Sequence, residues 1–572
     1  MKLYLLVVLL LVVPALAVEP PSQIHLSTTS DPSTSISVTW QTPVATDTLV
    51  QYGTSDNLNF TVHGKQYQYE GYGGYMHTAT LSLSPATRYY YRVGDGINWS
   101  AAYSFKTAPV VGSNNNFTVV VWGDQGYWAI NVPNAAESIN PDLAIIDGDL
   151  AYTKNESKVD VFFNHIQPLA SKTIVMAAVG NHEYDFFGPR SKNLFTFINR
   201  FTLPGNAAYP YLNERAYSIN YGNAHFSFLD LGEEPDDYSF EDQWEDVKNW
   251  LERDLASMPR NIVWKVIVVH FNLYASASGN PISHTKRLRQ IFEPVFRKHG
   301  IDLVIQAHEH KYERTYPLAD PDVENNQDTY NVVYETGEKE THFPVYLVVG
   351  TGGNCCYNAE PLEPWSAINL EESGYTKLIF SGNTLQEEFY TVKQDLRDRV
   401  IITKNTSTGK RRVSQFLELN ESSFDFSLFV VPPLSIEQGS ARSIVVNATQ
   451  LFGPISNATL AVWCRTAIAC QLDKYRGAFN FSSTLHIAAY ASTPIDNYKV
   501  LINITSGGLT KTSAILVSVV PPNTTNQSLH RYIEKNESQP KIQAPENSNA
   551  NTTIIQYLNQ LVEFFKRLIH YS

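Results

Sequence analysis

Five apolar segments in the middle of the chain each run into residues that can bind a metal ion. Their polar ends are Gly123-Asp124-Gln125-Gly126, Gly148-Asp149-Leu150-Ala151-Tyr152, Gly180-Asn181-His182-Glu183, His270, and Ala307-His308-Glu309-His310. A single Gly-Asp pair is usually a turn, and a single buried histidine usually belongs to the core. The carboxyl ends of strands line one crevice of an open α/β sheet, so all five groups can meet there. The recurrence of the pattern therefore predicts one shared metal site.

The candidate ligands are of two chemical kinds. Three offer hard anionic oxygens, which suit a trivalent ion such as Fe(III): Asp124, Asp149 and Tyr152. Three others offer a neutral amide or imidazole, which suits a divalent ion: Asn181, His270 and His308. Asp149 is the natural bridge between two ions, whereas the spacing of His308 and His310 does not show which ion each one serves. We therefore predict a dinuclear centre.

Such a centre has a definite chemistry. Three protein anions against a formal metal charge of about +5 leave about +2, which attracts a phosphate dianion and acidifies a bound water to hydroxide. Two ions about 3.5 to 4 Å apart can hold the phosphate oxygens while the hydroxide attacks phosphorus in line with the leaving alcohol. An imidazolium near the leaving oxygen would supply its proton. The residues thus predict hydrolysis of phosphate esters.

The five groups, with Tyr312-Glu313-Arg314 after the last one, resemble in order and spacing the five blocks of the purple acid phosphatases. Tyr152 separates this family from other dinuclear phosphoesterases, whose blocks are otherwise similar. The likeness covers about Pro21 to Asp398, so the chain looks like the larger, plant-type form. The resemblance implies a central β-sandwich covered by helices and an acid phosphatase activity.

The resemblance also implies roles for single residues. The ligands that it implies for Fe(III) are Asp124, Tyr152 and His310. Those that it implies for a divalent Fe, Zn or Mn ion are Asn181, His270 and His308, with Asp149 shared between the two ions. His182 is placed at the substrate, as a phosphate ligand or as the acid that protonates the leaving group. We expect its neighbour Asn181 to face the substrate as well.

Three positions depart from the family pattern. Ala307 stands where the family usually has Gly, and Asn272 stands where Pro is common. Plant-type relatives carry further substrate histidines downstream of His270, where this chain has Gly279 and only His284 nearby. His284 is therefore our candidate for a further substrate contact, the alternative being an ordinary polar loop residue.

Three folded regions are predicted from the pattern of apolar residues. Residues 18–109 contain short β-type segments such as Ser35–Trp40, which predict a fibronectin type III-like β-sandwich. Residues 110–404 alternate apolar strands with amphipathic helices, which predicts an α/β metallophosphatase domain whose sheet is covered on both faces. The clearest helix is Thr285–His299, stopped by Gly300. Strand patterns return in residues 405–522 and predict a C-terminal β-sandwich.

The two ends of the chain have different compositions. Residues 1–17 show the charged, apolar and small-residue order of a secretory signal; the alternative, a membrane anchor, needs an apolar run of about 20 residues. No other segment is long enough to span a membrane. Residues 523–551 predict a flexible glycosylated linker. Residues 552–572 predict an amphipathic helix that packs on a domain or on a second copy in a homodimer, with an interfacial membrane helix as the alternative.

Composition indicates the partners and the compartment. The formal net charge of -13 disfavours nucleic acid as a partner, although a local phosphate site remains compatible with it. Fourteen Asn-x-Ser/Thr sites predict N-glycans and, with the signal segment, a secreted, extracellular or lysosome-like location. In such a compartment disulfides persist. Cys464 and Cys470 are close enough in sequence for a bridge, and Cys355 and Cys356 predict a structural disulfide, either vicinal or between chains.

The leading hypothesis is a secreted acid phosphatase that acts on small phosphate monoesters. One alternative is a phosphodiesterase or nucleotide-hydrolysing enzyme on the same metal site, which rates on a monoester and a diester would distinguish. An alternative from a different class is an adhesion or binding glycoprotein that has kept an inactive phosphatase domain. The complete set of seven candidate ligands argues against that last alternative, because loss of function usually erodes ligands first.

Overall fold

The protein is described here from a computed structural model. The residues that it describes are 19–184, 194–207, 209–232, 241–276, 282–320, 332–335, 339–356, 363, 365–415, 425–430, 434–452, 457–464, 467–478, 481–506 and 509–522. They fall into two compact units, one reaching residue 419 without 361–364 and the other comprising 361–364 and everything from 420 onward. The predicted signal segment, linker and terminal helix all lie outside the described residues.

The N-terminal region is an antiparallel β-sandwich, as predicted. One sheet contains β1 (Ser22–Ser27), β2 (Ser35–Thr42), β6 (Tyr75–Ser82) and β5 (Lys65–Tyr67). The other contains β4 (Phe60–His63), β3 (Leu49–Gly53), β7 (Arg88–Gly94) and β8 (Tyr103–Lys106). Alternate residues of β7 are buried, since successive side chains of a strand point to opposite faces. Trp40 and Tyr91 are fully buried between the sheets.

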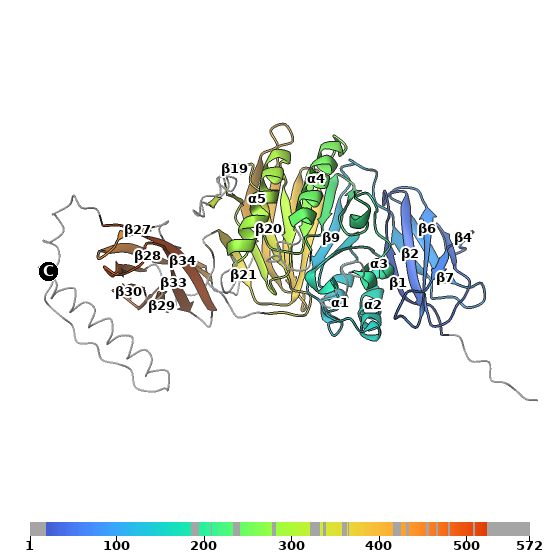
Figure 1. Cartoon of the computed structure of the whole chain (residues 1–572), viewed down its shortest axis with the longest axis horizontal. Coiled ribbons are helices and arrows are strands. Elements are labelled where there is room, and N and C mark those ends of the chain that lie inside the picture. The colour runs from blue at the N-terminus through green and yellow to red at the C-terminus, as the bar shows by residue number, and fades with distance from the viewer. Residues whose placement is uncertain are drawn as a thin grey trace, which may run out of the picture. The chain divides into compact units, whose positions relative to one another are not determined.

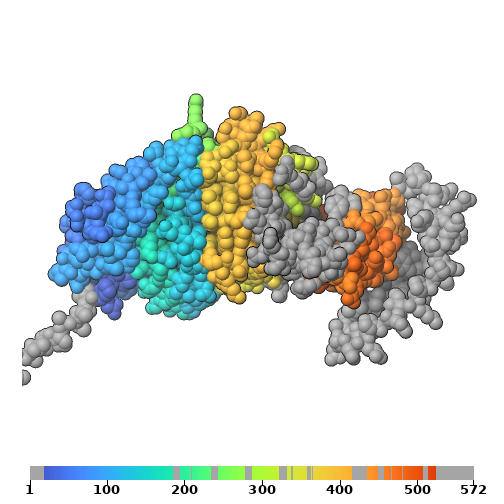
Figure 2. All heavy atoms as spheres, turned by 180° about the vertical axis from the view of Figure 1, so that it is seen from behind, coloured from blue at the N-terminus to red at the C-terminus, as the bar shows by residue number. Residues whose placement is uncertain are grey.

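The first central sheet continues the N-terminal one. Its parallel strands are β9 (Phe117–Trp122), β10 (Leu143–Asp147) and β11 (Ile174–Ala178). On the far side of β9 the sheet adds β22 (Gly374–Ser381), β23 (Thr384–Thr391), β24 (Leu396–Lys404), β25 (Arg411–Gln415) and β19 (Glu340–Thr341). At its other side β11 pairs in parallel with β1, so the sheet has 12 strands. In Figure 2 the blue, green and yellow parts of this unit form one continuous surface.

A second, 7-stranded sheet packs on the first. Its order is β12 (Tyr217–Tyr221), β13 (Ala224–Leu229), β14 (Trp264–Val269), β15 (Leu303–Gln306), β20 (Val345–Val349), β16 (Tyr312–Thr315) and β21 (Ser366–Leu370). The four strands from β13 to β20 are parallel, and their buried apolar runs are typical of parallel strands. The Phe380 ring of β22 meets Phe226 of β13 at 5.8 Å and Trp264 of β14 at 6.3 Å between centroids. The central region is therefore a two-sheet core, with a small pair of strands, β17 (Leu318–Ala319) and β18 (Val333–Tyr334), in addition.

Helices cover this core (Figure 1). They are α1 (Asn131–Glu137), α2 (Glu156–Ala170), α3 (Phe195–Arg200), α4 (Glu241–Ser257) and α5 (Ile282–His299), with short 3-10 turns η1 (Asn181–Glu183) and η3 (Pro210–Leu212). Helices α1 and α2 lie side by side on the 12-stranded sheet, and α4 lies beside α5. The predicted apolar stripe of α5 is buried, and Gly300 ends the helix with φ +63. The predicted helix over 285–299 is confirmed, with its start three residues earlier.

The second compact unit is a β-sandwich with its own core. One sheet contains β26 (Asp425–Val430), β28 (Ala441–Phe452), β32 (Phe481–Ala489) and β30 (Ile468–Leu472). The other contains β27 (Leu434–Glu437), β34 (Leu509–Val520), β33 (Asn497–Ser506), β29 (Asn457–Cys464) and β31 (Arg476–Ala478). The expected Cys464–Cys470 disulfide joins β29 to β30. Within the described part of the chain, no helix is long and apolar enough to cross a membrane.

Candidate metal centre

The five predicted ligand groups stand at the ends of strands from both central sheets. Asp124 follows β9, Asp149 and Tyr152 follow β10, and Asn181 follows β11 in the turn η1. His270 follows β14, and His308 and His310 follow β15. The sequence suggested the edge of one open sheet, whereas the structure brings together the carboxyl ends of strands from two facing sheets. Backbone hydrogen bonds connect them, including one of 3.0 Å from Ala307 N to His270 O.

One group of donor atoms, the tyrosine cluster, consists of Asp124, Tyr152 and His310. The Tyr152 hydroxyl lies 2.5 Å from Asp124 Oδ1 and 2.8 Å from His310 Nε2. His310 Nε2 lies 3.2 Å from the same carboxylate oxygen. Asp124 and His310 are buried, while Tyr152 is half-buried. Three donors from three separate loops thus point to one place.

A second group, the amide–histidine cluster, consists of Asp149, Asn181, His270 and His308. Asn181 Oδ1 lies 3.2 Å from His270 Nε2 and 3.1 Å from His308 Nδ1. Asp149 Oδ1 lies 3.4 Å from His270 Nε2. The candidate ligand atoms of Asp149, His270 and His308 all lie within 4.8 Å of one another. This cluster holds no phenol and one carboxylate, that of Asp149.

The spacing within the amide–histidine cluster fits an ion held by its donors. Ligands with bonds of about 2.0 to 2.2 Å to one ion lie about 3 to 3.5 Å from each other. The separations from 3.1 to 3.4 Å in the amide–histidine cluster have that size. Asp149 also faces the side of the tyrosine cluster, because its second oxygen, Oδ2, lies 3.9 Å from the His182 ring, whose centroid is 4.4 Å from that of Tyr152. The described residues therefore include a group of donors that could hold a metal ion, Asp149, His270 and His308, with the tyrosine cluster nearby.

Four of the candidate ligands have a left-handed backbone. The φ angles are +57 at Asp124, +51 at Asp149, +51 at Tyr152 and +63 at His308. Non-glycine residues in this region cost on the order of 1–3 kcal/mol each, and such residues cluster at functional sites. The sharp turns after β9, β10 and β15 direct these side chains into the site. Left-handed non-glycine residues also occur elsewhere in the described chain, but four of them are candidate ligands in the loops of this one site.

Two glycines admit the ligands by lacking a side chain. A Cβ on Gly180 would lie 2.2 Å from Asp149 Oδ1, and a Cβ on Gly148 would lie 2.5 Å from His270 Nδ1. Gly148 also has φ +73, which favours glycine for a second reason. The glycines of these two sequence groups are thus required by close packing around the ligands.

Burial and charge together set the protonation of the clusters. Burial alone would raise the pKa of Asp149, but His270 beside it holds that pKa well below its usual range. Burial lowers the pKa of His308 to about 4, so its imidazole is a neutral donor above that pH. Burial, with Asp124 and Asp149 nearby, raises the pKa of the Tyr152 phenol well above its usual value. Without an ion the phenol stays protonated, and only a strong local positive charge would make it a phenolate.

Several residues that orient the ligands were not assigned a role from the sequence. The Glu183 carboxylate accepts hydrogen bonds from the backbone N–H groups of Asp149, Leu150 and Gly180 at 2.7, 2.9 and 2.9 Å. It therefore ties the loop after β10 to the turn after β11. Asn354 N donates to Asp124 O at 2.9 Å from the glycine-rich turn after β20. The signal for Glu183 was its place directly after Asn181-His182, whereas nothing in the spacing pointed to Asn354.

The predicted substrate residues have different outcomes. His182 stands at the site: its backbone N–H donates to Asp149 Oδ1 at 2.8 Å, and its side chain is 41% exposed. Lys154 Nζ donates to the His182 carbonyl at 2.9 Å, which helps to hold this turn. Asn181 lies between His270 and His308. His284 belongs to α5, but its side chain lies outside the described residues, so its role stays a prediction.

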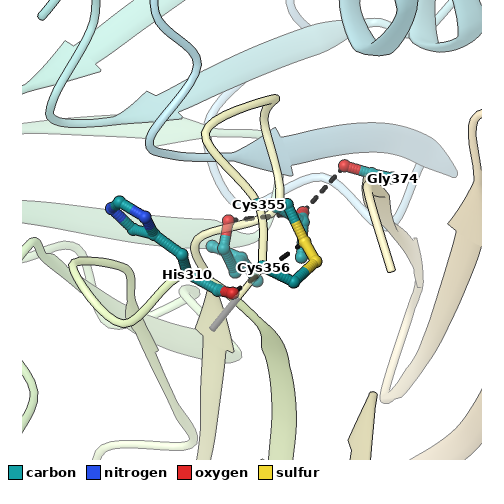
Figure 3. Close-up of a disulfide and its surroundings, with 6 residues drawn as sticks. His310, Cys355, Cys356 and Gly374 are labelled. Carbon is teal, nitrogen blue, oxygen red and sulfur yellow. Dashed lines mark hydrogen bonds between the residues drawn. A yellow bond between two sulfur atoms is a disulfide. The ribbon is translucent and has the colours of Figure 1, made fainter. Parts of the chain in front are cut away.

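The adjacent cysteines form a vicinal disulfide at the edge of the site. Cys355 is bonded to Cys356, which settles the alternative that the sequence left open (Figure 3). Cys355 Sγ lies 3.8 Å from the carbonyl oxygen of His310. The turn before the disulfide is anchored by Thr351, whose hydroxyl donates to Gly374 O at 2.8 Å (Figure 3). The disulfide is thus a structural neighbour of a candidate ligand.

Comparison with protein families agrees with this geometry. Residues 21–107 match the purple acid phosphatase N-terminal domain, residues 115–312 match calcineurin-like phosphoesterases, and residues 343–399 match the iron/zinc purple acid phosphatase-like C-terminal region. Acid phosphatase type 7 of Mus musculus is 30% identical over 413 residues, 66% of this chain and 88% of the relative. The chain belongs to the purple acid phosphatase family.

Other members of the family show how far the likeness goes. Purple acid phosphatase 18 of Arabidopsis thaliana is 26% identical, over 64% of this chain and 79% of the relative. A protein named probable inactive purple acid phosphatase 1, also from Arabidopsis thaliana, is 28% identical, over 57% of this chain and 59% of the relative. Among solved structures, one titled "Structure of PhoD" matches with a TM-score of 0.50 and 13% identity, over 70% of this chain and 93% of that one, which shows the fold alone.

This purple acid phosphatase accommodates its two departures at the ligand blocks. A Cβ on Gly123 would lie 2.5 Å from the Ala307 methyl, so the extra methyl at 307 depends on Gly123. Asn272, where Pro is common, donates its amide to Ala307 O at 2.8 Å. Ala307 therefore packs on the loop after β9, and Asn272 connects the loop after β14 to the loop that carries His308.

Proposed function

We propose that the chain is an acid phosphatase that hydrolyses phosphate monoesters at a dinuclear centre of Fe(III) and a divalent Fe, Zn or Mn ion. The observation that carries the proposal is the pair of donor clusters. One contains a phenol and a carboxylate, and the other contains an amide and two imidazoles, with Asp149 between them. Hard anionic oxygens suit a trivalent ion, and neutral nitrogen and amide ligands suit a divalent one.

Each residue then has an assigned task. Fe(III) would be held by Asp124, Tyr152 and His310, and the divalent ion by Asn181, His270 and His308, with Asp149 shared. Such ions, when bound, neutralise phosphate charge and acidify water. The carboxylate of Glu183 keeps Asp149 in place through the backbone. The His270 Nδ1 contact with Asp147 O at 2.8 Å fixes the imidazole so that Nε2 faces the site.

His182 is the residue that we assign to proton transfer. Its ring is partly exposed beside Asp149 and Tyr152 and is not one of the seven candidate ligands. A proton held on His182 would pass to the ester oxygen as the bond to phosphorus breaks, which makes the alcohol a better leaving group. His182 and Asn181 would also contact the phosphate. The same turn thus serves ligand and substrate.

The disulfides and the glycosylation sites indicate the compartment. Both cysteine pairs are disulfides, which persist in oxidising compartments. With the signal-like residues 1–17 and the N-glycosylation sites, they support a secreted, extracellular or lysosome-like protein that acts on small phosphate esters. A homodimer through the terminal helix stays a prediction.

Tyr152→Phe with absorption spectroscopy and metal analysis tests the proposal. We expect the iron-loaded wild type to be coloured, because a Tyr152 phenolate on Fe(III) absorbs visible light. We expect the variant to lose the band while its far-ultraviolet circular dichroism is unchanged, because only the hydroxyl is removed. A wild type that is fully loaded with iron yet colourless would contradict the assignment.

Rates decide between the proposed activity and its alternatives. We expect faster turnover of a phosphate monoester than of a diester by the same preparation. A preference for the diester would favour the phosphodiesterase. A metal-loaded protein with no activity on either ester would favour the binding glycoprotein, a real alternative because some relatives are named as probably inactive.

A further inference from the structure

A partly exposed tryptophan stands next to the candidate metal centre. The side chain of Trp128 is 48% exposed and follows Asp124 in the loop between β9 and α1. Its ring centroid lies 6.0 Å from that of Tyr152, and Tyr152 lies 4.4 Å from the His182 ring. The indole is therefore one aromatic ring away from the group assigned to the leaving oxygen. No step of the proposed mechanism uses it.

The loop that carries Trp128 is held firmly. Buried Gln125 accepts a hydrogen bond from Trp122 Nε1 at 2.9 Å and donates one to Ala129 O at 3.0 Å. The backbone N–H groups of Gly126 and Tyr127 donate to Leu150 O and Ala151 O at 2.9 and 3.1 Å. The loop is thus fastened to the segment that contains Asp149 and Tyr152. An aromatic side chain on a fixed backbone loses little conformational freedom when it binds a ligand.

Packing around the indole supports its edge and leaves part of its surface open. Tyr127 contacts Trp128 edge-on, at 5.1 Å between centroids and 80° between planes. Lys158 Nζ of α2 lies 4.8 Å from the centroid of the Tyr127 ring. Gly126 makes room for the indole, because a Cβ there would lie 2.6 Å from Trp128 Cζ2. The turn is therefore shaped to place an indole at this position without burying it.

We propose that Trp128 is a specificity residue that stacks on the aromatic leaving group of aryl phosphate monoesters. This inference rests on the proposed phosphatase activity. In the reaction the oxygen of water forms a new bond to phosphorus, and the electron pair of the broken ester bond stays on the aryl oxygen. The products are inorganic phosphate and a phenol, which takes up the proton. The indole acts only on the ring of the leaving group and makes no contact with phosphorus.

The choice of an aromatic group follows from the chemistry of the surface. Aromatic pairs prefer offset or edge contacts with centroids about 4.5 to 7 Å apart and contribute beyond the area that they bury. Trp128 is 48% exposed, so its open surface can meet a ligand ring at such a distance. An alkyl leaving group offers no ring face and would gain little there. The subsite should therefore discriminate aryl from alkyl esters, while the phosphate is bound elsewhere.

Three variants of the full-length protein test the inference: Trp128→Ala, Trp128→Phe and, as a control on the same loop, Ile130→Ala. Ile130 is 39% exposed and has no aromatic ring to stack on a ligand. The readouts are the dissociation constants of phenylphosphonate and methylphosphonate by calorimetry, kcat/KM for phenyl and ethyl phosphate, and metal content. We expect Trp128→Ala to weaken phenylphosphonate binding by roughly 2- to 12-fold, the size of an aromatic pair. The dissociation constant of methylphosphonate should change less than that of phenylphosphonate. Trp128→Phe keeps an aromatic ring and should therefore keep most of the difference in affinity between the two ligands.

The outcomes separate this inference from the proposed function. Equal weakening of both phosphonates by Trp128→Ala, or an equal effect of Ile130→Ala, would overturn the subsite and leave Trp128 a loop-supporting residue. Unchanged binding of phenylphosphonate would overturn it as well. If the wild type hydrolyses neither ester, the phosphatase proposal fails. If Trp128→Ala still weakens the binding of phenylphosphonate more than that of methylphosphonate, the aromatic subsite stands.

Discussion

At the scale of single residues, the site separates binding of metal from transfer of protons. The seven candidate ligands occupy two clusters, whereas His182 stands beside them with its ring partly exposed. Its backbone N–H donates a hydrogen bond to Asp149 Oδ1, and its side chain belongs to neither cluster. Removal of the ring should therefore affect chemistry more than metal content.

His182→Ala should keep nearly normal metal content and lower turnover of alkyl phosphates by roughly 10²- to 10⁴-fold, the range for a general acid. The loss should be smaller for a nitrophenyl ester, whose leaving group needs little protonation. If His182 only binds phosphate, both esters should lose similar amounts, in part through KM. His63→Ala, at an exposed position of β4, is the matched control and should change neither rate.

Asp149→Ala and His308→Ala should differ in the number of metal ions lost. Asp149 contacts His270 and is the ligand that we propose both ions share, so its removal should weaken both ions, whereas His308→Ala should mainly release the divalent one. Elemental analysis of iron and divalent metal in the purified variants measures this. An equal loss of both metals in the two variants would show that the site is not divided in this way.

At the scale of elements, the strand ends must approach closely for the ligands to meet. The turn after β11 packs against the turn after β10, and Gly180 is the point of contact. A side chain there must displace Asp149, which is itself held by the Glu183 carboxylate. The loops are therefore adjusted to each other as well as to an ion.

Gly180→Ala should reduce metal content and lower stability by about 1–3 kcal/mol, the usual cost of overpacking, because its Cβ would lie 2.2 Å from Asp149 Oδ1. Gly73→Ala is the control, since a Cβ there meets nothing within 4 Å. Metal analysis and thermal unfolding of both variants check the prediction. Full metal content in Gly180→Ala would show that the turn yields more easily than its packing indicates.

At the scale of the whole molecule, the N-terminal sandwich and the catalytic core form one compact unit. Strand β1 pairs with β11, and Arg200 of α3 reaches both regions. Arg200 is fully buried and donates to Gln23 of β1 at 2.7 Å and to Glu156 and Asp160 of α2 at 2.8 Å each. Its guanidinium also lies 4.0 Å from the Tyr72 ring. These contacts attach the sandwich to the helix that follows the Tyr152 loop.

Arg200→Ala should destabilise the unit by about 3–5 kcal/mol, because it removes a fully buried side chain and leaves the partly buried carboxylates of Glu156 and Asp160 without their partner. Arg397→Ala is the matched control: Arg397 pairs with Glu372 at the surface, where an ion pair contributes about 0–1 kcal/mol. Midpoints of thermal unfolding measured by circular dichroism compare the two. Equal midpoints would show that the sandwich is held mainly by its strand pairing.

The sequence by itself determined the strands, the ligand types and the family. Apolar runs such as Leu143–Ile146 reveal buried strands, and the residues after them are chosen by metal chemistry, so both signals are local. Asp124 and Tyr152, for example, are recognisable as candidate metal ligands from their residue types and their places after apolar runs. The helix over 285–299 was equally readable, because its apolar period of 3.6 is a property of the segment alone.

Only the tertiary structure decided which distant segments meet. It showed that the ligands come from two facing sheets, that β1 joins β11, and that Cys355 pairs with Cys356. It also gave Glu183 and Asn354 their supporting roles and placed Trp128 beside Tyr152. These relations depend on contacts between residues far apart in the chain or on the path of a single turn. Neither residue type nor periodicity encodes them, because a pattern fixes which face of an element is buried but not what packs against it.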